Sequence, residues 1–139
     1  MHRCLGLAQS FQGRYMDKVD SSLQKAKALK IEKYSRHILL CAGPKCCSSV
    51  SGDRVWDALK DELNERGLSA PAGSGDVFRT KVHCLRICSE GPIAVVYPEG
   101  TWYKNINEEG LRRIIDSHLQ KGEIVKDLVL AENDRIRGV

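Results

Sequence analysis

The chain has 139 residues, of which 42% are hydrophobic and 29% charged, and this is the size and composition of one globular domain that needs no disulfides to fold. No apolar run approaches the roughly 18 residues of a membrane helix, and no secretory segment opens the chain, so we expect a protein of the cytoplasm or of an organelle's stroma or matrix. Residues 1–35 hold seven Lys and Arg against three Asp and Glu, which accounts for the net charge of +4. The remaining residues are neutral, which argues against a nucleic-acid-binding protein.

Residues 1–35 are expected to form an extension in front of the domain. Residues 1–15 show no pattern, and we expect them to be disordered. In residues 16–33, apolar positions recur at helical spacing among lysines, which predicts an amphipathic helix. The cations of this helix are expected to face solvent.

A buried strand and a helix open the domain. The strand is the apolar run from His37 to Cys41, which Ala42-Gly43-Pro44 ends abruptly. The helix is predicted from Gly52 to Gly67, because apolar residues recur there every three or four positions. The residues expected to face the core are Val55, Trp56, Leu59 and Leu63.

A second strand, a hairpin and a last helix complete the pattern. Residues 77–82 alternate in polarity, as a strand with one solvent face does, and residues 93–97 and 101–103 read as the two arms of a hairpin. Asn105 and Glu108 have the spacing of a capping box in front of the last helix. The expected core residues of that helix are Leu111, Ile114, Ile115 and Leu119, and residues 125–130 are expected to add a strand or an extended tail. This order of strands and helices along the chain predicts an α/β fold. We expect a small mixed sheet flanked by helices in a thioredoxin-like arrangement.

Five of the six cysteines fall in two loops. Cys41, Cys46 and Cys47 lie where the first strand ends, and Cys84 and Cys88 lie between the second strand and the hairpin. In a reducing compartment, clustered thiols indicate metal or redox chemistry rather than disulfides. Two loops that each offer two thiolates suit a 2Fe–2S cluster, because each tetrahedral iron takes two cysteine sulfurs.

Two other uses of these cysteines are open. A structural zinc site also takes four thiolates, and the gaps of three residues in one loop and four or five in the other favour a cluster only slightly. A redox dithiol has less support, because the chain has no Cys-x-x-Cys and a disulfide between Cys46 and Cys47 would be strained. His83 adjoins Cys84, but no second His stands in the other loop, so a cluster with His ligands is not expected.

The residues around the cysteines suit an anionic cluster. Lys45, Lys81 and Arg86 lie close to the ligands in sequence, and Glu90 is the acidic exception. Glycines are expected to let backbone N–H groups approach the sulfurs, and they are Gly43, Gly52 and Gly91. His37, His118 and the Trp102-Tyr103 pair are expected to be structural.

Two sequence runs resemble the thioredoxin-like 2Fe–2S ferredoxin family. They are Cys-Leu-Arg-Ile-Cys-Ser-Glu-Gly-Pro at residues 84–92 and Tyr-Pro-Glu-Gly-Thr-Trp-Tyr at residues 97–103. The resemblance covers about residues 36–130, and residues 131–139 are then a C-terminal tail. The same module is similar to the small cluster-bearing subunit of respiratory NADH dehydrogenases.

The resemblance implies an electron-transfer protein rather than an enzyme, with one 2Fe–2S cluster per chain. It places the ligands at Cys41, Cys84, Cys88 and one of Cys46 and Cys47. Cys46 keeps the four-residue gap of the dehydrogenase subunit and is preferred, whereas Cys47 better keeps the distance to the next helix. Cys4 is expected to be incidental.

The predicted function is a one-electron carrier that serves redox partner proteins, a reductase or an acceptor. The resemblance also suggests a homodimer. One alternative is an electron-transfer subunit of a larger NADH- or hydrogen-linked complex, with the extension as a docking arm. Another is a zinc-stabilised or metal-free interaction module.

Overall fold

The computed structural model describes residues 21–70 and 75–137, and the chain divides after Lys33 into two compact units. In the first unit, residues 21–28 are helical. The disorder expected in residues 1–15 and the start of the helix expected over residues 16–33 lie outside the described residues. None of the helices in the described ranges has the length and apolar character needed to cross a lipid bilayer.

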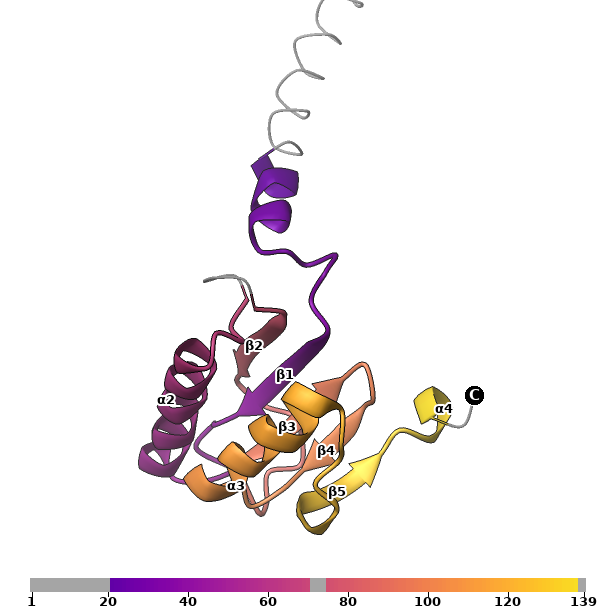
Figure 1. Cartoon of the computed structure of the whole chain (residues 1–139). Coiled ribbons are helices and arrows are strands. Elements are labelled where there is room, and N and C mark those ends of the chain that lie inside the picture. The colour runs from indigo at the N-terminus through magenta and orange to yellow at the C-terminus, as the bar shows by residue number, and fades with distance from the viewer. Residues whose placement is uncertain (1–20, 71–74, 138–139) are drawn as a thin grey trace, which may run out of the picture. The chain divides into compact units, whose positions relative to one another are not determined.

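The second unit is built on one mixed sheet with the strand order β2-β1-β3-β4-β5 (Figure 1). The central pairing is β1 parallel to β2 and antiparallel to β3, and the remaining neighbours are antiparallel. The strands are β1 (Arg36–Cys41), β2 (Val77–Val82), β3 (Ile93–Tyr97), β4 (Thr101–Tyr103) and β5 (Val129–Glu132). The first four form where the apolar run of residues 37–41, the alternation of polarity in residues 77–82 and the hairpin pattern of residues 93–103 predicted them. The fifth comes later than expected, after a short 3-10 turn.

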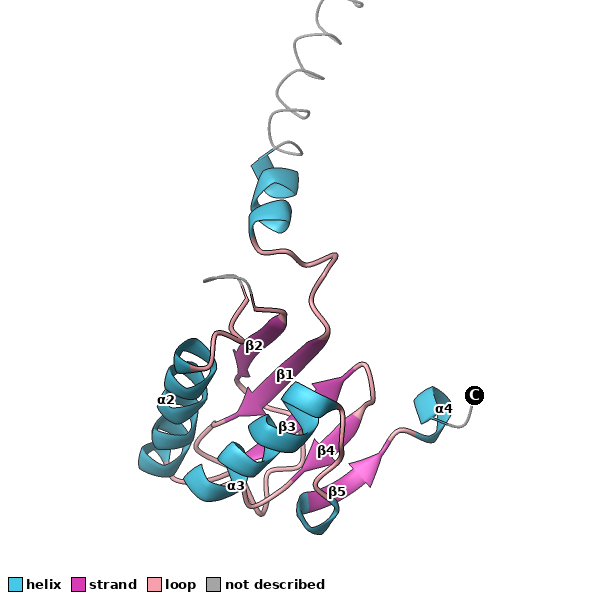
Figure 2. Cartoon of the chain, viewed as in Figure 1, coloured by secondary structure: helices cyan, strands magenta, loops and turns pink. Residues whose placement is uncertain are grey.

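Two helices pack against one face of this sheet (Figure 2). They are α2 (Ser49–Glu65) and α3 (Glu108–Ile114), and a π-helical turn, η1 (Ile115–Leu119), continues α3. Their apolar residues share one buried core with Ile38 and Leu40 of β1. The smaller elements are the 3-10 turn η2 (Lys126–Leu128) and α4 (Asp134–Arg137). The fold is therefore α/β with a five-stranded mixed sheet, as predicted.

The helix caps differ from the sequence-based expectation. Helix α2 begins at Ser49, because the Ser48 side chain accepts a hydrogen bond from the backbone N–H of Ser51. The cap of α3 is Asn107, which accepts from the N–H of Gly110 at 2.7 Å. The expected capping box at Asn105 is wrong, because Asn105 lies in the left-handed region and its N–H donates to the carbonyl of Glu90.

The opposite face of the sheet carries mostly apolar side chains, and neither α2 nor α3, which share the core on the other face, packs on it. Residues on this face alternate with the core residues along each strand, as the registers of the paired strands show. Val95 and Ile93 are buried there, whereas four large residues of this face keep part of their surface exposed: Leu39, Phe78, Tyr97 and Trp102. This face is a candidate contact surface.

A buried polar network ties the hairpin to the last helix. The hydroxyl of Tyr103 lies 2.7 Å from Nδ1 of His118, and Nε2 of His118 lies 2.5 Å from Glu99. Glu99 also accepts from Arg36 at 2.8 Å. Burial raises the pKa of Tyr103 to about 12, which keeps the phenol neutral. His118 and Tyr103 therefore hold the fold together, as expected.

Candidate metal centre

Both cysteine loops leave the same edge of the sheet. The strand registers place Cys41, the last residue of β1, beside Val82 at the end of β2 and Ile93 at the start of β3. The loop of residues 42–48 follows β1, and the loop of residues 83–92 joins β2 to β3. This arrangement brings the two groups of cysteines together, as predicted from their places at strand ends.

Direct backbone contact joins the two loops. The N–H of Gly91 donates to the carbonyl of Cys46 at 3.0 Å, and a Cβ at residue 91 would lie 2.6 Å from that carbonyl oxygen. Gly43 is packed in the same way against the carbonyl of His83. The expectation that these glycines serve to bring N–H groups to sulfur is only partly correct. Gly52 instead lets α2 pack against Ala42.

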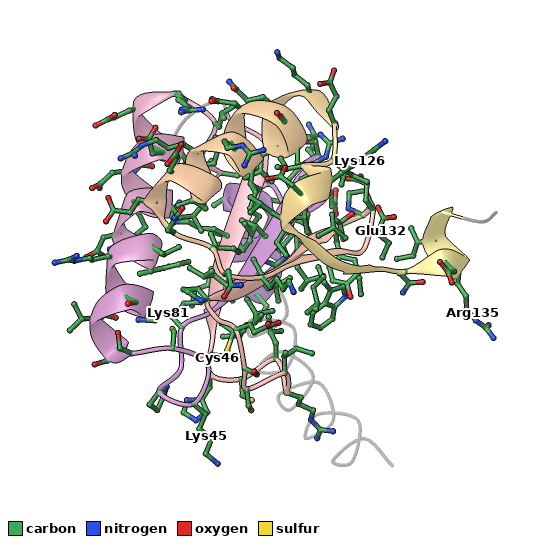
Figure 3. The ribbon with its side chains drawn as sticks, turned by 90° about the horizontal axis from the view of Figure 1, so that it is seen from below. Lys45, Cys46, Lys81, Lys126, Glu132 and Arg135 are labelled. Carbon is green, nitrogen blue, oxygen red and sulfur yellow. The ribbon has the colours of Figure 1, made fainter. Side chains whose placement is uncertain are left out.

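Four thiols face one cavity. Cys41 Sγ lies 3.0 Å from Cys46 Sγ, and Cys84 Sγ lies 3.8 Å from Cys88 Sγ. The two pairs line a cavity of about 240 Å³, whereas Cys47 lines a separate cavity beside the start of α2. Figure 3 shows Cys46 in the loop region below the sheet and Lys45 extending away from it. The structure therefore brings together four of the predicted cysteines and turns Cys47 elsewhere, and Cys4 lies outside the described residues.

The two pairs differ in exposure and in acidity. Cys41 and Cys46 are buried, with exposed fractions of 1% and 7%, whereas Cys84 and Cys88 are exposed. Burial raises the pKa of Cys46 to about 12, and the hydrogen bond with Cys41 adds to the rise. Burial acts in the same direction on Cys41, but hydrogen bonds from Cys46 and from backbone N–H groups outweigh it and lower its pKa. Cys41 is thus the first of the pair to become a thiolate.

Backbone N–H groups of the second loop point at the sulfurs. The N–H of Arg86 donates to Cys84 Sγ at 3.2 Å, and those of Leu85 and Cys88 donate to Cys41 and Cys46 in the other loop. Arg86, Cys88 and Glu90 all lie in the left-handed region, with φ of 71°, 56° and 56°. A non-glycine residue there costs on the order of 1–3 kcal/mol. No Gly or Asn signals this conformation, so the sequence did not predict these donors.

The geometry fits a centre in which each metal ion takes one pair of thiolates. Two thiolates on a tetrahedral ion, with metal–sulfur bonds of ~2.3 Å, lie about 3.8 Å apart. This matches the separation of Cys84 and Cys88, and Cys41 and Cys46 would have to move apart by less than about 1 Å. In the described residues, no three His, Cys, Asp or Glu side chains converge to hold a single metal ion. The thiols form two pairs instead.

The comparisons with known proteins decide the family. No protein-family model matches the chain. A 2Fe–2S ferredoxin from Clostridium pasteurianum is 35% identical over 99 residues, which cover 66% of this chain and 92% of that protein. A 2Fe–2S ferredoxin from Aquifex aeolicus is 40% identical over 104 residues, which cover 70% of this chain and 90% of that protein. This chain belongs to the thioredoxin-like 2Fe–2S ferredoxin family.

The solved structures agree with this assignment. The thioredoxin-like 2Fe–2S ferredoxin of Aquifex aeolicus matches this fold with a TM-score of 0.61 and 26% identity, over 73% of this chain and 94% of that chain. The sequence-based predictions of the family, of the fold and of a ferredoxin electron carrier rather than an enzyme are confirmed. The ligand set remains a prediction.

Proposed function

We propose that this ferredoxin carries one electron at a time on a single 2Fe–2S cluster held by Cys41, Cys46, Cys84 and Cys88. The observation that supports this ligand set is the cavity that these four thiols line together, with Cys47 outside it. Two pairs of thiolates correspond to the two irons, each with two cysteine sulfurs. Cys47 is then a half-buried thiol that packs beside the ligands.

The chain's own residues would set the properties of the site. When bound, the cluster supplies reversible one-electron chemistry. Cys41 and Cys46, which are buried with Ile93, would hold one side of it against the apolar interior. The N–H groups of Leu85 and Arg86 stabilise negative charge on sulfur, and this favours the reduced form. The geometry therefore supports electron transfer without a bond-making step.

The ferredoxin family implies redox partner proteins. Clustered cysteines that hold a metal centre rather than disulfides suit a reducing compartment, which supports placing the protein in the cytoplasm or in an organelle's stroma or matrix. The homodimer stays a prediction. Its support is the apolar sheet face of Leu39, Phe78, Tyr97 and Trp102, and light scattering on the loaded protein would check it.

Metal analysis tests the proposal against its zinc rival. After anaerobic purification, we expect about two irons and two sulfides per chain and a red-brown visible spectrum, because a four-thiolate 2Fe–2S cluster has this content. Zinc should be present only in traces. A colourless protein that holds zinc, or that takes up no iron and sulfide on reconstitution, would contradict the proposal.

A further inference from the structure

The candidate site is exposed on one side only. Cys41 and Cys46 are buried under the end of the sheet, whereas Cys84, Cys88 and Ile87 between them are exposed, Ile87 by 41%. A cluster held by these cysteines would therefore reach the surface at the loop of residues 84–88. Electron transfer between proteins falls steeply with distance, so a partner has to dock over this loop.

The surface around this loop carries cations without ion-pair partners. Lys45 lines the cysteine cavity and is exposed, and Arg86 is exposed in the loop itself. Within the described part of the chain, neither has a carboxylate in ion-pair distance, although Lys81 is paired with Asp53 at 3.0 Å. We call Lys45 and Arg86 the cationic rim.

Acidic residues do not offset the cationic rim. Glu90, the acidic residue of the second loop, is paired with Lys104 at 3.3 Å. Asp53, beside the first loop, is paired with Lys81. Both pairs are exposed, and each cancels its own charge. Among the charged side chains around the exposed cysteines, the two of the cationic rim are therefore the unbalanced ones, and they stand at the surface beside the negative charge that the cluster itself would carry.

The inference rests on the proposed function. We propose that a redox protein with an acidic surface docks over Cys84 and Cys88, where it would contact Ile87 and the cationic rim. A small apolar centre with charges around it is typical of transient interfaces. Opposite charges on the two partners raise the rate of encounter and orient the complex. Each encounter moves one electron from the reduced cluster to the oxidised centre of the partner, and no bond forms or breaks.

The test compares one acceptor in two charge states. The probes are native cytochrome c, which is basic, and succinylated cytochrome c, whose lysines have become carboxylates. The reduced, cluster-loaded ferredoxin is mixed anaerobically with each ferric cytochrome. At low ionic strength we expect the succinylated form to be reduced about tenfold faster, and this advantage should fall as salt is added.

Matched variants locate the effect. Lys45→Gln with Arg86→Gln removes two positive charges at the rim and should reduce the preference for the succinylated form several-fold. The control, Lys121→Gln with Arg135→Gln, removes one lysine and one arginine charge outside the proposed docking site. This double variant should leave the preference for the succinylated form unchanged. Lys121 lies at the opposite end of β1 from the cysteines. Its neighbour Gly122 packs against Arg36 at the start of β1, whereas Cys41 ends the strand.

The outcomes separate this proposal from the proposed function. The visible spectrum and the iron content establish that each protein tested carries its cluster. If the loaded wild-type protein reduces both cytochromes equally, shows no salt dependence, or responds equally to both double variants, the docking site is wrong and the electron carrier stands. The salt dependence is measured on the wild-type protein, so it tests the docking site without any variant. Failure of the wild-type chain to bind a cluster would overturn both.

Discussion

Replacing Cys46 by Ser is expected to remove most of the iron and sulfide from the protein, whereas replacing Cys47 by Ser should leave both at two per chain. Cys46 lines the cavity shared with Cys84 and Cys88, with its Sγ 3.0 Å from that of Cys41, and Cys47 lines another cavity. Changes that only disturb the surroundings of a metal ligand cost about 10–100-fold in affinity, so loss of a ligand should lower the affinity by more than this and leave most chains without a cluster.

The two variants control for each other, because they make the same chemical change at adjacent positions. Iron, sulfide and the visible spectrum are measured on both after identical anaerobic purification. Circular dichroism verifies that each variant is folded. Loss of the cluster in Cys47→Ser with retention in Cys46→Ser would reverse the assignment. Full retention in both would show that neither thiol is required.

Replacing Gly91 by Ala is the second change with a large expected effect. The added Cβ would lie 2.6 Å from the carbonyl oxygen of Cys46 and 2.8 Å from its Cβ, so the Cys46 backbone would have to shift. Overpacking of this kind costs typically 1–3 kcal/mol. Because the displaced residue is a proposed ligand, we expect lower cluster content and faster loss of visible absorption in urea.

Gly67→Ala is the matched control. Gly67 follows the far end of α2, has a φ of +67° and has no atom within 4 Å of the position of an added Cβ. This variant has a conformational cost of about 1 kcal/mol but should keep its cluster. Cluster loss confined to Gly91→Ala would show a local displacement of Cys46. Equal cluster stability in the two variants would contradict the close approach of the loops.

The strand positions could be predicted because the alternation of polarity and the turn residues indicated the same strand boundaries. The alternation in residues 77–82 and the turn at residues 98–100 place β2 and the hairpin, and the structure has them there. The helices were harder to place. A helical pattern identifies the apolar side of a helix but not the face of the sheet that it covers, and both α2 and α3 pack on the same face.

The site could be predicted as a group of cysteines but not in its details. Cys46 and Cys47 are adjacent, so spacing alone left the choice open, and the turn at Gly43, which accepts from the N–H of both, directs only Cys46 into the cavity. The cap of α3 was misplaced because Asn105 and Asn107 are both good caps in isolation. The hydrogen bond from the N–H of Asn105 to the carbonyl of Glu90 determines the conformation of Asn105. Glu90 lies in the cysteine loop, outside the segment in which the helical pattern was sought.

The most direct test of a one-electron carrier is an anaerobic reductive titration of the loaded wild-type protein, followed by its visible absorption. We expect one reducing equivalent per chain, partial bleaching as the cluster is reduced, and full return of the absorption on reoxidation. Uptake of two equivalents per chain without a change in the visible spectrum, as for a dithiol, or no uptake at all, would contradict the account.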